Sequence, residues 1–124
     1  MVRQVCLDSD IIIQLLNKDE TIKKILESLD AEFCTTTINT FEVWFGRKKE
    51  DPASELLSAL HIHALESNAT KLGADILREL KRTGQLIDMR DLFVGAICIE
   101  KKLELLTLNK KHFERLRKFG LVLV

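Results

Sequence analysis

The sequence predicts an α/β protein, a three-layer α/β/α sandwich built on a central, mainly parallel sheet of about five strands. Short apolar segments typical of buried strands alternate with helical segments along the whole chain, and this alternation favours parallel strands covered on both faces. The 124 residues, 46% of them hydrophobic and 31% charged, are enough for one globular core. Without repeats or linkers, we expect a single domain over residues 1–124.

The first half of the chain is expected to form two strand–helix units. An apolar run ends at Leu7, and the polar residues that follow it mark the change from strand to helix. Glu42 belongs to the first or second turn of the helix after the second strand; a capping box with Asn39 is its purely structural interpretation. The expected elements are a strand ending at Leu7, a helix over 10–16, a helix over 20–29 capped by Asp19, a strand over 31–36, and a helix from 37–39 to about Lys49.

The second half repeats this alternation. The helix around residues 92–99 is expected to be the most buried, because every residue there is apolar or glycine. Asp88 is its predicted N-cap, which places Asp91 in the first turn, where the helix dipole favours an anion. The other expected elements are a helix from Asp51-Pro52 to about Leu60, a strand over 61–65, a helix over 67–82 capped by Ser67 and stopped by Gly84, a strand over 104–107, a basic helix over 110–118 capped by Asn109, and a strand over 121–124.

The charge distribution is uneven although the formal net charge is zero. Residues 8–32 hold seven acids against three lysines, and residues 101–118 hold seven bases against two acids. Such asymmetry can place a basic lip beside an acidic site. No apolar run is long enough for a membrane span, and the N-terminus lacks the pattern of a signal peptide, so we expect a cytoplasmic protein without membrane contact.

The cysteines and histidines are expected to be structural. Cys6, Cys34 and Cys98 each lie in an apolar run, which predicts reduced, buried thiols, and their spacing disfavours zinc. His61 and His63 share one face of a predicted strand and are candidates for a ligand pair, but no third nitrogen or sulfur ligand follows nearby.

Polar side chains gather where the predicted strands end or the next helices begin. The carboxyl ends of parallel strands meet at one edge of a sheet, so these groups are expected to converge. Several carboxylates without cations would repel one another, whereas oxygen ligands suit Mg²⁺ or Mn²⁺. An acid-lined Mg²⁺ site suits the hydrolysis of phosphodiesters, although other phosphate chemistry fits too. The residues are Asp8, Ser9, Asp10, Glu42, Asp88, Asp91, Thr107 and Asn109.

Four short motifs, in this order, resemble the PIN domain family, and within it the compact VapC-type toxins. The resemblance covers essentially the whole chain. The motifs are residues 7–11 (Leu-Asp-Ser-Asp-Ile), 38–46 (Ile-Asn-Thr-Phe-Glu-Val-Trp-Phe-Gly), 84–96 (Gly-Gln-Leu-Ile-Asp-Met-Arg-Asp-Leu-Phe-Val-Gly-Ala) and 106–113 (Leu-Thr-Leu-Asn-Lys-Lys-His-Phe).

The resemblance implies a Mg²⁺-dependent endoribonuclease, the toxin of a toxin–antitoxin pair, commonly a homodimer that binds an antitoxin protein. It implies that Asp8, Glu42 and Asp91 bind the metal and that Asn109 fills a fourth position. Ser9 and Thr107 match hydroxyl positions beside the site, and Asp10 and Asp88 are expected as further neighbours. The basic segment is expected to contact RNA through Lys110, Lys111 and Arg115.

Two positions depart from the family pattern. Asp10 stands where the family usually has Asn, which adds negative charge beside the metal. His112 stands where an acid is often found, which makes a stable second metal ion doubtful. The alternatives are a haloacid-dehalogenase-like phosphatase with Asp8 as nucleophile, and a PIN-like module that binds RNA or protein without catalysis.

Overall fold

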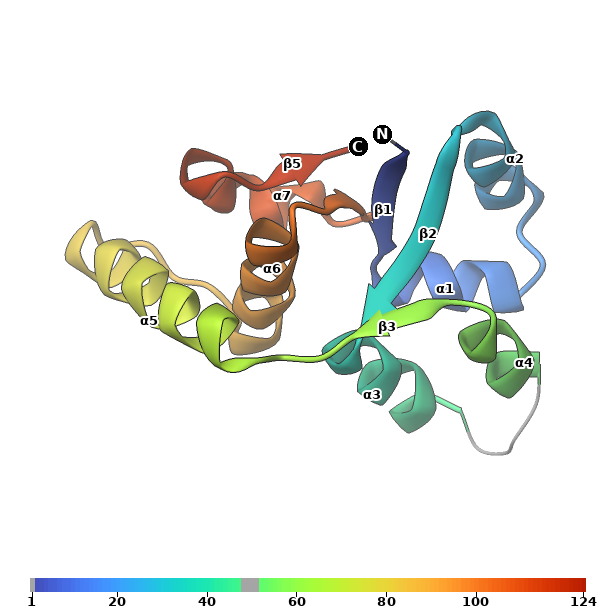
Figure 1. Ribbon diagram of the computed structural model, residues 1–124, viewed down its shortest axis with the longest axis horizontal. Helices are drawn as coiled ribbons and strands as arrows, with labels where there is room; N and C mark the ends of the chain where they lie inside the picture. The colour runs from blue at the N-terminus through green and yellow to red at the C-terminus, as the bar shows by residue number, and fades with distance from the viewer. Residues whose placement is uncertain (1, 48–51) are drawn as a thin grey trace.

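The structure is a computed structural model that describes residues 2–47 and 52–124, and its centre is a parallel sheet (Figure 1). Within the described residues the sheet has five strands in the order β3-β2-β1-β4-β5. All four pairings are parallel. This confirms the predicted fold class. The strands are β1 (Arg3–Leu7), β2 (Ala31–Thr36), β3 (His61–His63), β4 (Glu104–Leu106) and β5 (Val122–Leu123).

Helices cover both faces of the sheet and form a separate core on each. One core holds Val5 and Leu7 of β1 against Ile11 and Ile12, which are almost fully buried. This face is covered by α1 (Ser9–Leu16), α2 (Glu20–Ser28), α3 (Thr37–Phe45) and α4 (Pro52–Ser58).

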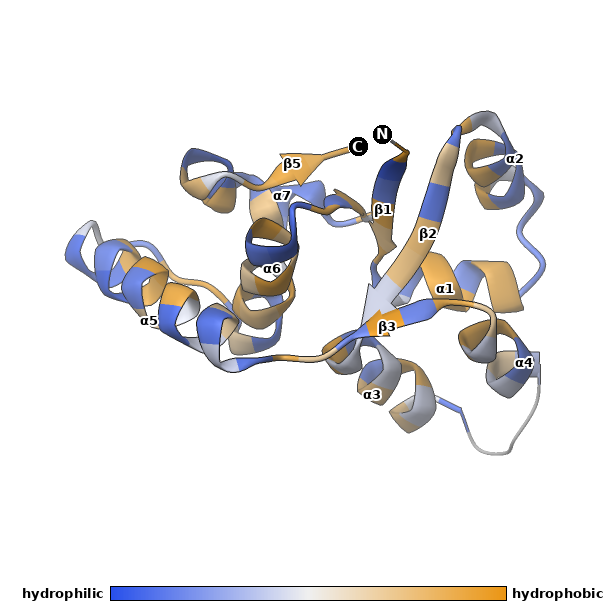
Figure 2. Ribbon diagram, viewed as in Figure 1, coloured by the Kyte–Doolittle hydropathy of each residue, from blue (hydrophilic) through white to orange (hydrophobic). Residues whose placement is uncertain are grey.

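The other core contains the cysteines and is covered by the C-terminal helices. Cys6 of β1 and Leu105 of β4 pack there with Leu80, Cys98 and Phe113. These helices are α5 (Ser67–Arg82), α6 (Met89–Lys101), α7 (Lys110–Phe113) and the 3₁₀ helix η1 (Glu114–Phe119). Figure 2 shows mostly apolar colour on α6, whereas polar colour interrupts α5 repeatedly. The expectation that α6 is the most buried helix agrees with its run of buried residues over 94–98.

Several predicted helix ends are shifted in the structure. The α1 N-cap is Asp8, whose carboxylate accepts from the Ser9 amide, so the helix begins one residue earlier than expected. Thr36 caps α3 through the Asn39 amide, which excludes Asn39 as the N-cap of a capping box. Glu66 rather than Ser67 is the N-cap residue of α5, and it makes no side-chain capping bond.

The C-terminal basic segment also differs from the prediction. It is one turn of α-helix, α7, followed by η1, in place of a continuous helix over 110–118. The side chain of Asn109 makes no capping bond to α7, because its amide is turned toward Asp10. By contrast, Asp19 and Asp88 cap α2 and α6 as predicted. The predicted cap at Asp51 lies outside the described residues. The helix expected to run to about Lys49 ends earlier, since α3 stops at Phe45 with Gly46 as its C-cap.

The strand order creates a crevice at one edge of the sheet. From β1 the chain proceeds outward through β2 and β3, then returns to add β4 and β5 on the other side of β1. The order therefore reverses between β1 and β4, and in open α/β sheets ligands bind outside the carboxyl ends of the strands at such a point. The Asp8 amide donates to the Leu106 carbonyl (3.0 Å), which ties the two strand ends together there. No helix within the described residues is long and apolar enough to cross a membrane.

Candidate active site

Asp8 lies at the end of β1, in this crevice, and is held by three hydrogen bonds. Asp8 is only 8% exposed to solvent. Oδ1 accepts from the Ser9 amide (2.9 Å) and from Nδ2 of Asn39 (2.8 Å). Oδ2 accepts from the Thr107 hydroxyl (2.6 Å), which comes from the end of β4. The carboxylate is therefore fixed in position by groups from three different elements.

Asn39 supports this arrangement from the first turns of α3, where it is fully buried. Besides Asp8, its Nδ2 donates to the Ser9 hydroxyl (2.9 Å). Its Oδ1 accepts from the Thr36 hydroxyl (2.7 Å), so the amide orientation is set by its neighbours. The sequence pattern predicts Asn39 only as a helix cap and does not reveal this role. The sequence feature that could have revealed this role is the position of Asn39, three residues before Glu42 within the motif over residues 38–46.

Glu42 reaches the same crevice from α3 and is held by one hydroxyl and one cation. The Ser9 hydroxyl donates to Oε1 (2.7 Å). Arg90 Nη1 lies 3.5 Å from Oε2, and Arg90 also pairs with Asp88. Arg90 is a second residue that the sequence analysis missed. Asp88 itself lies at the periphery, where it caps α6 and holds Arg90, and it does not line the crevice.

Asp91 faces the crevice from the first turn of α6 and has fewer partners. Its Oδ2 lies 3.5 Å from Nδ1 of His112. Burial, followed by the negative charge of Asp8, raises the pKa of the Asp91 carboxyl above its usual value. Asp91 is therefore a carboxylate placed among acids with little hydrogen bonding to stabilise its charge.

Asp10 projects from α1 toward the loop after β4. Its Oδ2 accepts from the Leu108 amide (3.1 Å) and from Nδ2 of Asn109 (3.2 Å), and the Thr107 hydroxyl lies at 3.4 Å. Oδ1 is buried without a hydrogen-bond partner. Burial and the charge of Asp8 raise the pKa of Asp10 to about 6. Asp10 therefore links α1 to the Asn109 loop, and it does not cap the helix.

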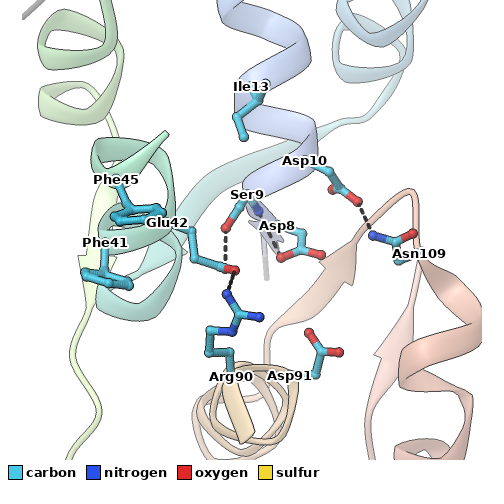
Figure 3. A pocket seen from close by; sticks show the side chains of 10 residues that line it. All are labelled: Asp8, Ser9, Asp10, Ile13, Phe41, Glu42, Phe45, Arg90, Asp91 and Asn109. Carbon is cyan, nitrogen blue, oxygen red and sulfur yellow. Dashed lines mark hydrogen bonds and ion pairs between the residues drawn. The ribbon is translucent and has the colours of Figure 1, made fainter. Parts of the chain in front are cut away.

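These side chains line one cavity of about 310 Å³. Figure 3 shows Asp8, Glu42 and Asp91 entering it from β1, α3 and α6, with Asn109 on the side of Asp10. The structure thus brings together the predicted residues Asp8, Ser9, Asp10, Glu42, Asp91 and Asn109, while Thr107 donates a hydrogen bond to Asp8. The remaining lining residues are Ile13, Phe41, Phe45 and Arg90.

The donor chemistry of this cavity fits a hard divalent cation. Its acidic side chains are carboxylates from separate elements, and their mutual repulsion contributes to the raised pKa values of Asp10 and Asp91. The buried, unpartnered Oδ1 of Asp10 is a further sign of uncompensated negative charge. Across residues 2–47 and 52–124, however, no three His, Cys, Asp or Glu side chains form a ready-made metal site. The cavity lining nonetheless offers carboxylate and amide oxygens to a cation, with no His or Cys side chain among the lining residues.

The predicted RNA-contacting residues border the acidic cavity without lining it. Lys110 and Lys111 line an adjoining hollow with Thr107 and Asn109. Arg115 lines another with Asp91 and His112. Basic side chains of the C-terminal segment thus border the acidic cavity, as the charge pattern of the sequence predicted.

The cysteines and the histidine pair lie away from this cavity. All three cysteines are free and buried. The hydrogen bond with Cys6 and burial raise the pKa of the Cys34 thiol well above its usual value, which disfavours thiolate chemistry. His61 and His63 contact each other edge to face, with ring centroids 4.4 Å apart.

Comparisons with known proteins identify relatives of this chain. The sequence profile described as "PIN domain" matches residues 5–119. Ribonuclease VapC1 of Methanocaldococcus jannaschii is 54% identical over 46 residues, which are 37% of this chain and 34% of that protein. The matched segment therefore spans about a third of the length of this relative.

Solved structures share the fold over nearly the whole chain. A chain of VapBC2 from Rickettsia felis, solved bound to a promoter DNA fragment, has a TM-score of 0.83 and 24% identity over 98% of this chain and 97% of that one. A chain of a toxin–antitoxin complex from Klebsiella pneumoniae has a TM-score of 0.75 and 25% identity over 88% and 89%. Because the family profile covers most of the sequence, the chain belongs to the PIN domain family.

Proposed function

We propose that this protein is a Mg²⁺-dependent endoribonuclease that hydrolyses RNA phosphodiester bonds as the toxin of a toxin–antitoxin pair. The observation that carries the proposal is the cavity in which Asp8, Glu42 and Asp91 meet at the switch point of the sheet. The ribonuclease named among the relatives and the toxin–antitoxin complexes among the structural neighbours support the substrate and the biological role.

In this proposal Asp8, Glu42 and Asp91 hold the cation, with Mn²⁺ as an alternative to Mg²⁺. When bound, the cation supplies a water of lowered pKa and neutralises charge that develops on the phosphate. The protein's own contribution is positioning. Asn39, Thr107 and the Ser9 amide orient Asp8, and the Ser9 hydroxyl orients Glu42. Outer hydrogen bonds of this kind fix the ligands of a metal site.

Asn109 and Arg90 are assigned roles at the rim. Asn109 is proposed as the fourth residue of the site, and Asp10 holds its amide. Arg90, paired with Glu42, offers a guanidinium that can donate to a phosphate. We propose an antitoxin protein as partner and a homodimer as the assembly, on the strength of the toxin–antitoxin complexes among the neighbours.

The test is cleavage of a labelled single-stranded RNA by purified protein in Mg²⁺, in EDTA, and in EDTA followed by excess Mg²⁺. We expect cleavage, its loss in EDTA, and its return. Asp8→Asn should stay inactive throughout, and this control excludes a contaminating nuclease. Equal cleavage in EDTA would refute the metal mechanism, and no cleavage in any metal would favour a non-catalytic PIN module.

The phosphatase alternative is weakened by the family profile, which matches the PIN domain over residues 5–119. The phosphatase reading predicts hydrolysis of a small phosphomonoester and a trappable aspartyl-phosphate. Neither is expected here.

A further inference from the structure

Two exposed phenylalanines stand at the mouth of the acidic cavity. Phe41 and Phe45 are separated by one turn of α3 and lie on the same side of it. They are 61% and 83% exposed, which is unusual for such large apolar side chains. Their rings are nearly parallel, with an interplanar angle of 22° and centroids 6.0 Å apart. Neither ring fills the core, which α3 reaches through Val43.

The rings are part of the cavity that contains the acids. Both line it, and Glu42 follows Phe41 directly in the chain. Figure 3 shows the two rings side by side next to Glu42, across the cavity from Asn109. A molecule whose phosphate lies among Asp8, Glu42 and Asp91 therefore extends over these rings if it continues toward α3.

The chemistry of the lining favours a nucleobase over a protein side chain as the occupant. Seven of the ten lining residues are polar or charged, and the apolar part consists of Ile13 and the two rings. A protein-docking groove has a more apolar centre. An exposed, flat aromatic surface beside a phosphate-processing site is instead the arrangement on which single-stranded nucleic acids stack their bases.

We propose that Phe41 and Phe45 form a stacking platform for an unpaired base of the RNA next to the scissile phosphate. The inference rests on the proposed function and deepens it, because it names the residues that hold the RNA beside the scissile phosphate. A paired base is held in its own stack and is not free to lie on the platform. The two rings act as positioning residues: they hold the chain in register while the acids carry out the chemistry.

The test compares Phe41→Ala and Phe45→Ala with Phe45→Leu, Phe45→Trp and Val122→Ala. Val122 is an exposed apolar residue on β5, outside the cavity, and serves as the control. The first readout is binding in EDTA of a single-stranded RNA 12-mer carrying 2-aminopurine at several positions, whose fluorescence is quenched by stacking. The second is single-turnover cleavage in Mg²⁺ as a function of protein concentration.

We expect each Ala variant to weaken binding and reduce quenching. Loss of one stacking contact corresponds to a weakening of roughly 5-fold to 150-fold. The half-saturating concentration should rise by the same factor in the cleavage assay, while the rate at saturation changes little. Phe45→Trp should keep the quenching and affinity of the wild type, whereas Phe45→Leu should lose them as Phe45→Ala does. Val122→Ala should match the wild type. Circular dichroism of each variant confirms that it is folded.

Three results would overturn the inference. The Ala variants could bind and quench like the wild type, or Leu could replace Phe fully, which would reduce the contact to apolar burial. The variants could also lose a dimer mass in light scattering while RNA binding is unchanged, which would assign the rings to a protein contact. Absence of cleavage by wild-type protein refutes the proposed function instead, and the binding readout separates the two failures because it needs no catalysis.

Discussion

The two sides of the acidic cavity are built differently. On the strand side, Asp8 is nearly buried and accepts three hydrogen bonds from Ser9, Asn39 and Thr107. On the helix side, Asp91 has only His112, at 3.5 Å, as an ion-pair partner within the described residues. The two sides hold acids of the same type, and on the helix side burial and neighbouring negative charge raise the pKa of Asp91.

This difference indicates a division between a carboxylate that the fold holds in place, Asp8, and one that it holds less firmly, Asp91. Hydrogen bonds from neutral donors stabilise the charge of Asp8 without any cation. Within the described residues no neutral donor hydrogen-bonds to the Asp91 carboxylate, so its ionised form gains more from a bound cation. Glu42 is intermediate between the two, since one hydroxyl and one guanidinium hold its carboxylate.

The largest expected effect comes from the two acids themselves. Asp8→Asn and Asp91→Asn should each reduce RNA cleavage in Mg²⁺ by about 100-fold or more, because a metal site supplies several kcal/mol of transition-state stabilisation. Their stabilities should differ. In EDTA, Asp8→Asn should lower the free energy of unfolding by about 1–3 kcal/mol, since it turns an amide donor toward existing donors.

Asp91→Asn, in contrast, should leave the free energy of unfolding unchanged or raise it, because it removes a poorly compensated charge. Urea denaturation of both variants at pH 7 in EDTA measures the difference. Equal destabilisation by the two substitutions would contradict the division between the two sides of the cavity.

The next largest effect should come from Asn39, which donates a hydrogen bond to the Asp8 carboxylate. Asn39→Ala removes the donor to Asp8 and to the Ser9 hydroxyl, and residues in this outer role typically contribute 10-fold to 100-fold in metal affinity or activity. We expect a loss of that size in cleavage, with a higher Mg²⁺ concentration needed for half-maximal rate. Thr40→Ala is the matched control, because the Thr40 hydroxyl lies on the same helix, donates to the Thr37 carbonyl and is outside the cavity lining. Similar losses for both variants would point to a general effect on α3.

The position of Asp8 on the strand side was also easier to predict from the sequence than the contacts on the helix side. The apolar run before Asp8 and the polar residues after it indicated a strand end, and the alternation of strands and helices indicated the parallel sheet. These signals are local, so sequence patterns carry them. The α1 boundary was displaced by one residue because the side chain that ends the strand also caps the helix.

The contacts around Asn39, Arg90 and Asp10 could not be obtained in this way. Asn39 reaches Asp8 across 31 positions of the chain, and Asp10 reaches Asn109 across 99. Such pairings depend on how α3 and the loop after β4 pack around β1. Composition correctly suggested basic residues beside the acids, but it could not reveal that α7 and η1 break the basic segment into two helices.

A smaller effect is expected at Asp10, which sits between the two sides. Its pKa is raised from 3.8 to about 6, so between these values the folded protein binds more protons than the unfolded chain. The stability contributed by Asp10 is therefore present below about pH 4 and is lost as the pH rises to about 6. Asp10→Asn should remove this loss and stabilise the protein in EDTA at pH 7 by about 1 kcal/mol, a value reduced for the partial exposure of the carboxyl.

Urea denaturation of Asp10→Asn and wild type at pH 4.5 and pH 7 tests this sign. The stabilisation by Asn should be larger at pH 7 than at pH 4.5. A pH-independent difference would mean that Asp10 keeps an ordinary pKa, and the hydrogen bonds to Leu108 and Asn109 would then outweigh its burial.

The smallest effect should come from the lysines beyond Asn109. Lys110→Ala and Lys111→Ala leave both sides of the acidic cavity intact, because these side chains line only the adjoining hollow. Each should weaken binding of single-stranded RNA by a similar factor for different sequences and reduce the slope of log affinity against log salt by about 0.7. Lys23→Ala is a control on α2, which contributes no residue to the acidic cavity. If the salt slope of the Lys110 and Lys111 variants equals that of the control, RNA does not cross the C-terminal side, and its path must run from the acids toward Phe41 and Phe45 alone.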